Sequence, residues 1–412
     1  MLIDSPKPRY DIVIVGAGMV GASFAVALQG EATARYSVLV LEAFPLFNSG
    51  IDRPEPSFDA RSTALSGGSA EFLGEIDLWD SLSQHATPIE QILVSDQGRF
   101  GTANIDSQEQ RVEALGHVVE NQQIGSVLRR KLEQTPQLDV LAPAKISTVK
   151  PIANGMQVNL DLGGKHCVVE GSLVVLADGG KSPICKSLGI DSRHEDYKQS
   201  AIISNISFEN PHRNRAFERF TQSGPLAVLP LSNFEGRPRA SLVWSVESEH
   251  AQAMIDLPEA EFLSQLQAAF GHRLGRINGV GERFCFPLRL SVAKEQIRPG
   301  LVLLGNVAHN LHPVAGQGFN LALRDVRSLV GVLRECAENS ANPGDMSTLL
   351  RYLDAQRGDQ EMTIQLTHLL TKAFSNNRRA LVLLRKLGLL SIDLLPSIRN
   401  RFARQAMGLG IS

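Results

Sequence analysis

Cysteine is scarce in this chain, and the few cysteines are scattered. Only four occur among 412 residues, at Cys167, Cys185, Cys285 and Cys336. They form no Cys-x-x-Cys pair and no zinc-type spacing with histidine, so the sequence gives no sign of a metal site. We expect reduced, mostly buried thiols rather than a disulfide framework, which fits a cytoplasmic protein.

An excess of charge of either sign is also missing. Lysine and arginine number 41 and aspartate and glutamate 43, for a net charge of −2. The basic surplus that attracts nucleic acid is absent, so we expect no nucleic-acid partner. With 43% hydrophobic and 20% charged residues, the composition is that of an ordinary globular protein whose length allows two or three structural units.

A run of uncharged residues long enough to cross a membrane is lacking as well. The run Ile12–Leu28 is shorter than the ~20 residues that a span needs, and no other segment qualifies. An alternative interpretation makes it the core of a signal peptide, with Ala25–Ala27 as the cleavage site. Asp4 and Asp11 before the run, and three glycines within it, argue against that alternative.

What the sequence has instead is glycine at fixed spacing after a short apolar strand. Residues Tyr10–Val15 are predicted as a buried strand and Met19–Gln29 as a helix of small and apolar residues. Gly16, Gly18 and Gly21 lie between them, where they allow a tight turn, close approach of a pyrophosphate and close helix–strand packing. The helix N-terminus offers free N–H groups and a positive dipole end to the phosphates.

A carboxylate follows at the distance that nucleotide binding requires. A second predicted strand, Ser37–Leu41, ends at Glu42, about twenty residues after the glycines, where an acidic side chain accepts hydrogen bonds from a ribose diol. Strand, glycines, helix, strand and acid together predict a nucleotide-binding unit. The alternative is a structural turn that binds no ligand, and the motif alone does not distinguish NAD from FAD.

Two later stretches repeat the pattern of a buried strand followed by glycine. The second stretch, 172–190, runs from an apolar strand into an Asp-Gly pair and a short helix. The third, 300–326, runs from a buried strand through Gly-Asn and a glycine-rich turn into a helix that starts near Phe319. The glycines before that helix leave backbone N–H groups facing a phosphate or an electron-rich ring.

The order and spacing of these three motifs resemble those of the single-component FAD-dependent aromatic hydroxylases. In that family the first motif holds the ADP part of FAD, and the Asp-Gly motif lies near the pyrophosphate and the nicotinamide donor. The third motif holds the ribityl chain and lines the isoalloxazine ring. The resemblance implies FAD as the cofactor and implies these cofactor-binding residues: Gly16, Gly18, Gly21, Glu42, Asp178, Gly179, Gly305, Asn306, Pro313, Gly316 and Gly318.

Two further residues match the family outside the glycine motifs. Arg61, in FDARSTALS, matches an arginine that reaches the cofactor, and Asn121, in ENQQIGSVL, stands where the family often has a polar or basic cofactor contact. One departure is Asn306, because the family usually has Gly-Asp in the third motif. An amide oxygen still accepts a bond from a ribityl hydroxyl, without the charge that makes such a bond about twice as strong.

The resemblance extends over nearly the whole chain and is strongest with the ubiquinone-biosynthesis hydroxylases, above all those of 2-polyprenyl-6-methoxyphenol. It rests on FDARSTALS, on RAFERFTQSGPLAVLPL (215–231) and on LHPVAGQGFNLALRDV (311–326), and Asn306 is a feature of the same branch. It implies that NADPH or NADH reduces FAD, that the reduced flavin takes up O2 at carbon 4a, and that the peroxide hydroxylates a phenol ring. The sequence identifies no catalytic acid or base.

The residues themselves predict a compatible architecture. Short alternating runs over 200–245, separated by Gly, Pro and Asn, indicate an antiparallel sheet inserted between the second and third motifs, with a pocket at the domain interface. We therefore expect an α/β fold with a Rossmann-like FAD-binding domain of the aromatic-hydroxylase type, an inserted antiparallel-sheet substrate domain and a helical C-terminus. The expected domains are 1–185 (FAD-binding, with an excursion at 75–115 toward the substrate domain), 186–296 (substrate), 297–345 (third motif and helix) and 346–412 (helical).

Several conspicuous side chains have ordinary explanations. His309 and His312 flank the third motif and are expected to be structural or to line the ring pocket, because no further metal ligands are nearby. Arg324 and Asp325 are expected to form an ion-pair network that anchors the long helix.

In the substrate region, Trp244 is expected in the core, and His117 as a packing residue near a strand. For Arg215 and Arg219 two interpretations stay open: contact with substrate or donor, or solvent-exposed strand charges.

The last segment, 372–412, combines eight Lys/Arg with the single acid Asp393 and many apolar residues. One interpretation is peripheral contact with an anionic membrane, at the inner face of the cytoplasmic membrane, or with other ubiquinone-biosynthesis proteins. The other is a helix packed on the FAD domain with solvated arginines. A polyprenyl phenol substrate, with O2, favours the membrane. The alternatives to the leading function are a flavin hydroxylase of a soluble aromatic and a weakly active scaffold subunit.

Overall fold

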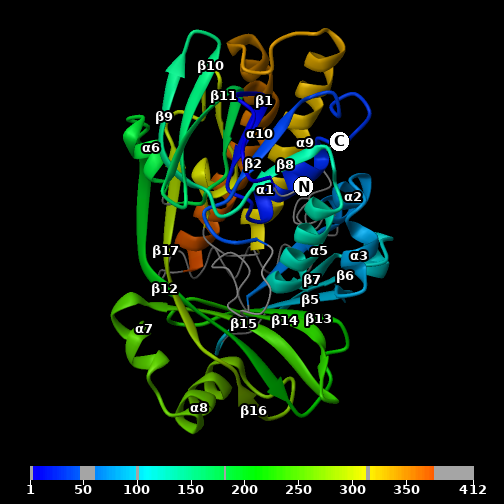
Figure 1. Cartoon of the computed structure of the whole chain (residues 1–412). Helices are drawn as coiled ribbons and strands as arrows, with labels where there is room; N and C mark the ends of the chain where they lie inside the picture. Colours follow the sequence, from blue (N-terminus) through cyan, green and yellow to red (C-terminus); the bar gives the residue numbers. More distant parts are fainter. Residues whose placement is uncertain (1–2, 47–60, 99–101, 181, 312–315, 375–412) are drawn as a thin grey trace.

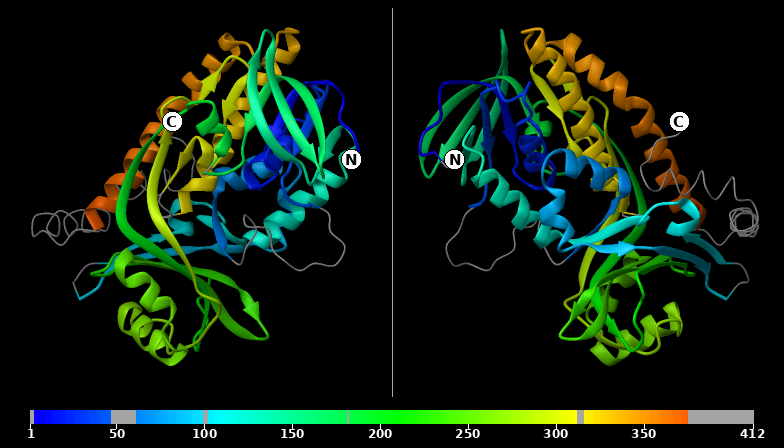
Figure 2. Two further views of the ribbon diagram at one scale, coloured as in Figure 1. Left: turned by 60° about the vertical axis from the view of Figure 1, so that its left-hand side comes forward. Right: turned by 90° about the vertical axis from the view of Figure 1, so that its right-hand side faces the viewer.

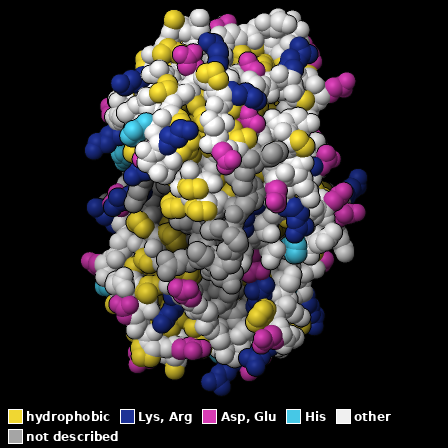
Figure 3. All heavy atoms as spheres, in the orientation of Figure 1, with side chains coloured by type: hydrophobic (Ala, Val, Ile, Leu, Met, Phe, Trp, Pro, Cys, Tyr) yellow, Lys and Arg dark blue, Asp and Glu magenta, His cyan; other side chains and the backbone are white. Residues whose placement is uncertain are grey.

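The protein consists of an upper body built on a parallel sheet and a lower body built on a long antiparallel sheet (Figure 1). The computed structural model describes residues 3–46, 61–98, 102–180, 182–311 and 316–374. Lys, Arg, Asp and Glu side chains of both signs are interspersed over the described part of the face in Figure 3. No helix among the described residues is both long and apolar enough to span a bilayer.

The upper sheet has the strand order β18-β19-β11-β1-β2-β8, and its pairings along this order are parallel except that of β18 with β19. Its central strands are almost wholly buried, as expected for a parallel sheet covered on both faces. A meander of β9 and β10 extends it through β11. The strands are β1 (Arg9–Val15), β2 (Val38–Leu41), β8 (Leu138–Leu141), β9 (Lys145–Ile152), β10 (Gly155–Leu162), β11 (Lys165–Leu176), β18 (Ile297–Arg298) and β19 (Leu301–Leu303).

The two strands predicted at Tyr10–Val15 and Ser37–Leu41 are thus confirmed within one residue. The helix predicted at Met19–Gln29 is α1 (Met19–Ala27), which ends two residues early. The uncharged run Ile12–Leu28 therefore forms β1 and α1 in the middle of the core, and this folded role accounts for its lack of charge.

Helices cover one face of this sheet and form the largest apolar cluster with it. The N-terminal helix packs between α5 and α9, and α10 lies along α9 at the outside of the body (Figure 2). The helix predicted from about Phe319 begins two residues earlier. The helices of this body are α1, α2 (Gly67–Glu75), α3 (Trp79–Ser83), α5 (Asn121–Glu133), α6 (Pro183–Ser187), α9 (Gln317–Glu338) and α10 (Met346–Phe374), whereas the short α4 (Ser107–Gln110) contacts β6.

The lower sheet has the order β20-β17-β12-β15-β14-β13-β5-β6, with β16 beside β12. All printed pairings within it are antiparallel except β13 with β5, so the antiparallel sheet predicted over 200–245 is confirmed. Its strands are β5 (Gln91–Asp96), β6 (Thr102–Asp106), β12 (Ser192–Phe208), β13 (Arg215–Phe220), β14 (Pro225–Phe234), β15 (Arg237–Glu247), β16 (Ile277–Val280), β17 (Phe284–Ala293) and β20 (His309–Asn310).

One feature of this sheet was not predicted. Strand β12 is continuous from Ser192, and the polar residues of its first half gave no strand pattern in the sequence. It runs beside β17 from the upper body into the lower sheet (Figure 1). The hairpin β5–β6 lies within the expected excursion 75–115 toward the substrate domain, and it joins the sheet through β13. The domain boundaries expected from the sequence stay a prediction.

The far face of the lower sheet is covered by α7 (Ser248–Ile255) and α8 (Glu259–Phe270). Trp244 is 5% exposed there and meets Phe262 edge to face, with ring centroids 5.9 Å apart. The expected core role of Trp244 is therefore confirmed. The near face turns toward the upper body, and the small sheet of β3 (Ser62–Ser66), β7 (Gly116–Glu120) and β4 (Thr87–Ile89) lies between the two.

Candidate functional site

The three glycine motifs meet in the folded chain. A Cβ added to Gly16 would lie 2.7 Å from the carbonyl oxygen of Ala177, so the first motif touches the second. A Cβ on Gly305 would lie 2.9 Å from Val20, and one on Gly180 would lie 3.4 Å from the carbonyl oxygen of Asn306. The motifs are thus packed together at the carboxyl ends of β1, β11 and β19, where open α/β sheets bind their ligands.

The first motif forms a phosphate-binding helix start. Gly18 is the N-cap of α1, and neither a capping side chain nor an acidic residue occupies this described terminus. Its first N–H groups therefore have no intrahelical acceptor and point out at the positive end of the helix dipole. A Cβ on Gly21 would stand 1.9 Å from the carbonyl oxygen of Gly16, so this packing admits only glycine.

Glu42 lies directly beside this helix start. One carboxylate oxygen accepts from the backbone N–H of Ala17 at 2.7 Å and the other from the N–H of Phe44 at 3.1 Å. These bonds fix the carboxylate at the end of β2 while leaving it further lone pairs. The position is the one predicted for a ribose contact.

Asp178, in the second motif, is a buried carboxyl. Its pKa is raised to about 6, chiefly by burial and to a lesser extent by the nearby Glu42, while hydrogen bonds from Ser182 and from the backbone oppose the change. Its Oδ1 atom has no hydrogen-bond partner within the described part of the chain. A buried acceptor without a donor is expected where a bound group supplies one. Gly179 follows with φ +92°, a conformation that favours glycine.

The third motif turns twice before α9. Gly305 opens a short 3-10 turn that leaves the Asn306 side chain exposed, and Gly316 caps α9 in the left-handed conformation, φ +61°. No described atom lies within 4 Å of a Cβ built on Gly318, so this glycine borders open space. The expectations for His312 and Pro313 lie outside the described residues.

Asn320, which the sequence analysis missed, fixes the start of α9. Its Oδ1 accepts from the backbone N–H of Ser66 at 2.9 Å and from the hydroxyl of Ser69 at 2.7 Å. Its Nδ2 donates to the carbonyl oxygens of Ala64 at 2.8 Å and of Gly316 at 2.9 Å. A buried amide with four partners ties the third motif to β3, and only its place one turn after the glycines could have signalled it.

Arg61 and Asn121 lie side by side at the join between the two bodies. The backbone N–H of Asn121 donates to the carbonyl oxygen of Arg61 at 2.8 Å, and its Oδ1 accepts from Thr63 at 2.6 Å. The Arg61 guanidinium stacks over the ring of Phe286 in the lower sheet, 4.6 Å from its centroid. Arg61 is therefore held at the border between the motifs and the sheet.

The predicted network around Arg324 and Asp325 is confirmed. Arg324 pairs with Asp359 of α10 at 2.6 Å. The fully buried Asp325 binds Nε2 of the equally buried His309, and its other oxygen accepts from Gln360 at 2.8 Å. These contacts fasten α9 to β20 and α10, which makes His309 structural. His117 packs edge to face on Trp79, as expected, and burial lowers its pKa.

The lower sheet turns one set of side chains toward the FAD-binding body. Ala216 and Leu231 cluster with Ile89, Leu115 and Val118 of that body, which identifies the near face. A cross-strand row on this face is mostly apolar and half-buried: Val94, Glu218, Ala227, Val243, Ile203 and Phe284. Side chains of this kind suit an aromatic, lipid-like ligand and keep water away from it.

Arg215 and Arg219 are not part of this near face. Arg219 donates to the carbonyl oxygen of Ala269 in α8 at 2.8 Å, and Arg215 donates to Gln91 at 2.8 Å. Since residues alternate along a strand, both point to the α8 side with Phe217. Both are half-buried and bonded, so they are not solvent-exposed strand charges, and contact with substrate or donor stays a prediction.

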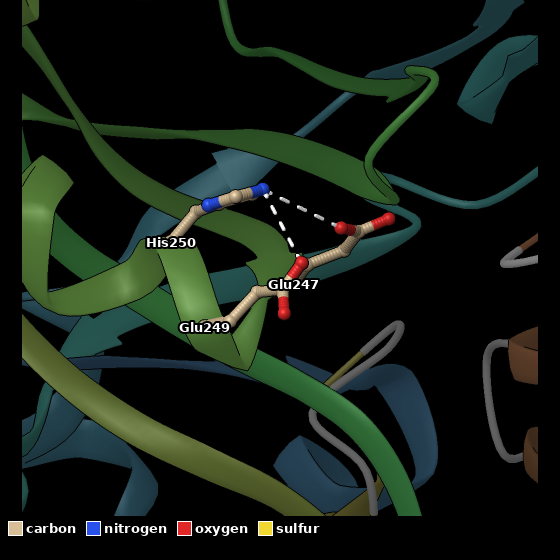
Figure 4. A group of neighbouring side chains, drawn as sticks. All are labelled: Glu247, Glu249 and His250. Atoms are coloured by element: carbon tan, nitrogen blue, oxygen red, sulfur yellow. Dashed lines mark ion pairs between the residues drawn. The ribbon is translucent and has the colours of Figure 1, made fainter.

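Three exposed side chains, Glu247, Glu249 and His250, lie together at the start of α7 in the lower body (Figure 4). His250 Nε2 lies 3.7 Å from a Glu247 oxygen and 3.5 Å from a Glu249 oxygen. Acidic groups at a helix N-terminus are stabilised by the helix dipole, which explains the cluster without an ion. The expected absence of a metal site stays a prediction.

These observations fit FAD. The cradle contains a free helix start for a pyrophosphate, a fixed carboxylate for a ribose, a buried acceptor that lacks a donor, and glycines at which a Cβ would collide. Such a site suits a long, polar, phosphate-bearing cofactor rather than a metal ion.

Comparison with known proteins supports this assignment. The family described as FAD binding domain matches residues 9–355. The ubiquinone hydroxylase UbiL of Rhodospirillum rubrum is 33% identical over 402 residues, covering 97% of this chain and 89% of the relative. The 3-demethoxyubiquinol 3-hydroxylase of Escherichia coli is 29% identical, covering 97% and 98%. The mitochondrial ubiquinone biosynthesis monooxygenase COQ6 of Mus musculus is 29% identical, covering 95% and 90%.

Solved structures show the same fold. The p-nitrophenol 4-monooxygenase PnpA from Pseudomonas putida superposes with a TM-score of 0.77 over 96% of this chain and 97% of its own, at 17% identity. PqsL, a probable FAD-dependent monooxygenase from Pseudomonas aeruginosa, gives a TM-score of 0.74 over 93% and 100%, at 19% identity. Sequence and fold agree that the chain belongs to the FAD-dependent monooxygenase family of the ubiquinone-biosynthesis hydroxylases.

Proposed function

We propose that this enzyme hydroxylates the aromatic ring of a polyprenyl methoxyphenol during ubiquinone biosynthesis, using O2 and NADPH or NADH. The observation that carries the proposal is the junction of the three glycine motifs with a half-buried apolar sheet face. A cofactor cradle beside such a face suits an apolar aromatic substrate. The named activities of the 33% and 29% identical relatives support the ubiquinone pathway.

The chain's own residues bind and orient. The N–H groups at the start of α1 would hold the pyrophosphate of FAD, and Glu42 would hold its ribose. Asp178 and the third motif, with Asn306, Gly316 and Gly318, would hold the remainder. When bound, FAD supplies the electron transfer and oxygen activation that no side chain provides.

The near face of the lower sheet would shape the substrate site and exclude water from it. Its near-face row offers apolar side chains to the substrate ring and tail, and Arg61 over Phe286 connects this face to the cradle. Excluding water protects a reactive oxygen species from unproductive breakdown, so this is a catalytic contribution.

We further propose peripheral contact with the inner face of the cytoplasmic membrane through 372–412, since a polyprenyl substrate resides in the bilayer. Eight Lys/Arg against one acid in that segment support this. The outer side of α10, which leads into the segment, exposes Met362 by 38% and Leu369 by 64%. The docking of other ubiquinone-biosynthesis proteins on this segment is the competing proposal.

The test is a lipid extract of a strain that lacks the gene, grown in air. We expect a polyprenyl methoxyphenol to accumulate, and the wild-type chain to remove it where Gly18→Val does not. A normal quinone pool in the strain, with no accumulated phenol, would contradict the ubiquinone assignment and favour a soluble aromatic substrate. If a variant that binds no FAD restored the normal quinone pool, the result would favour a scaffold role.

A further inference from the structure

One carboxyl group on the near face of the lower sheet is not used by the cofactor site. Glu218 lies in the middle of β13, paired with Ala227 of β14 on one side and Val94 of β5 on the other. We propose that Glu218 is the catalytic base that accepts the proton of the substrate's phenol hydroxyl. This inference rests on the proposed function, since it assigns a residue to the same reaction.

The direction of Glu218 follows from its neighbours along the strand. Phe217 meets Phe270 of α8 edge to face at 5.5 Å, and Arg219 bonds to Ala269, so the odd residues face α8. Ala216 packs with Val118 of the FAD-binding body. Because successive side chains of a strand point to opposite faces, Glu218 points with Ala216 toward that body.

The surroundings of Glu218 on this face are apolar. Its cross-strand neighbours are Ala227 and Val94, and the row continues through Val243 and Ile203. Strand β14, beside it, carries no charged residue. An ionisable group is costly in such a place, and its presence in a half-buried apolar row points to a function.

Other charged groups near Glu218 occupy two positions on its own strand and one on the adjoining strand β5. Arg215 and Arg219 of its own strand lie on the opposite face and are bonded to Gln91 and to α8. Asp96 of β5 lies at the end of its strand, opposite Phe220. Burial alone raises the pKa of Glu218 to about 7, with no charged group contributing.

This environment makes Glu218 a better base toward a phenol. A phenol ionises near pH 10, so an ordinary glutamate is weaker as a base by about six powers of ten. A glutamate that titrates near 7 narrows the difference to about three powers of ten. The acid and base are then close enough in strength for proton transfer to assist attack by the ring.

The step balances without an added oxidant. The phenol O–H bond breaks, an O–H bond forms on the Glu218 carboxylate, and the electron pair stays on the substrate oxygen. That pair raises the electron density of the ring where oxygen is transferred. After hydroxylation the proton returns to the product oxygen, which regenerates the carboxylate.

The kinetic test compares Glu218→Gln with Glu247→Gln in FAD-loaded enzyme and uses 2-geranyl-6-methoxyphenol as substrate. Glu247 is an exposed carboxylate of the same sheet, at the end of β15 beside the start of α7, so it is the matched control. We expect kcat/KM of the wild type to rise with pH through about 7, because the ionised carboxylate is the active form. Because general-base catalysis contributes about a hundredfold or more, kcat/KM of Glu218→Gln should be about a hundredfold lower and should no longer rise with pH. Glu247→Gln should match the wild type in both respects.

A binding test needs no turnover and separates this inference from the proposed function. The probes are 2-geranyl-6-methoxyphenol and its methyl ether, titrated against the flavin absorbance of holoenzyme. Wild type and Glu247→Gln should prefer the phenol by about tenfold, the value of one charge-assisted hydrogen bond, and Glu218→Leu should show no preference.

An unchanged preference in Glu218→Leu, or an unchanged pH profile in Glu218→Gln, would overturn the inference even if the enzyme hydroxylates the phenol. A different outcome is that Glu218→Leu loses the preference for the phenol over its methyl ether but the wild type hydroxylates no methoxyphenol. That outcome would overturn the proposed function and keep Glu218 as the residue that recognises the hydroxyl. FAD content and Tm of each variant show whether it folds.

Discussion

The cofactor cradle and the near face of the lower sheet lie side by side but are built in different ways. The cradle is made of backbone: N–H groups at helix starts and glycines against which a neighbouring carbonyl oxygen packs. The near face is made of side chains that alternate along ordinary strands. A phosphate-binding backbone requires glycine at fixed spacing, whereas a ligand-facing strand needs only suitable side chains at every second position.

The largest expected effect breaks the cradle. Gly21→Ala places a Cβ 1.9 Å from the Gly16 carbonyl oxygen, and backbone cannot move aside cheaply. We expect the purified variant to contain no FAD and to unfold at a Tm lower by more than five degrees. Flavin absorbance and a thermal melt measure both.

The matched control is Gly331→Ala in the middle of α9, where no described atom lies within 4 Å of the added Cβ. Alanine in a helix interior should stabilise by about 0.5–1 kcal/mol and leave FAD binding intact. Full flavin content in Gly21→Ala would show that the cradle tolerates a side chain.

The next effect concerns the polar network that fastens α9 under the cradle. Asp325→Ala removes the partner of buried His309 and of Gln360. Leaving such groups unpaired costs about 3–5 kcal/mol, so urea unfolding should show a loss of that size. An Arg324→Gln control breaks the partly exposed pair with Asp359 and the hydrogen bond to Thr363, and should cost about 1 kcal/mol. Equal losses would contradict the buried network.

A third prediction uses the pH dependence of Asp178. Its folded pKa, about 6, lies above its ordinary value of 3.8, so between these values the folded chain holds a proton that the unfolded chain has lost. Stability from this group therefore falls as pH rises from about 4 to about 6 and is level above that. Asp178→Asn cannot ionise, so it should gain about 2 kcal/mol relative to wild type over this window, after allowance for partial solvent screening.

Tm measured at intervals from pH 4 to pH 8 without added FAD gives this difference. A constant difference between the two proteins across the window would mean that Asp178 is solvated in the folded chain.

The sequence predicts the two regions unequally. The first two strands, α1 and the three glycine motifs are predicted because their function depends on spacing. Asn320 and Glu218 were missed because a buried amide and a strand carboxyl differ from surface residues only in their surroundings. The length of β12 was missed because its polar first half lacks an apolar alternation.

The smallest effect distinguishes the near face from the cradle. Val243→Ala trims a half-buried near-face side chain that packs against the apolar cluster around its cross-strand partner Ile203. Because it touches none of the glycine motifs, FAD content should be unchanged and stability should fall by about 1 kcal/mol. KM for 2-geranyl-6-methoxyphenol should rise severalfold with little change in kcat. A loss of FAD instead would show that the two regions are not separable.

The most direct test of the central claim is turnover of 2-geranyl-6-methoxyphenol by FAD-loaded enzyme with NADPH or NADH under isotopically labelled O2. The account predicts a product with one added oxygen atom that carries the label, formed as the reduced nicotinamide is consumed. A product whose added oxygen comes from water, or nicotinamide oxidation that yields no hydroxylated product with this or longer-chain phenols, would contradict it.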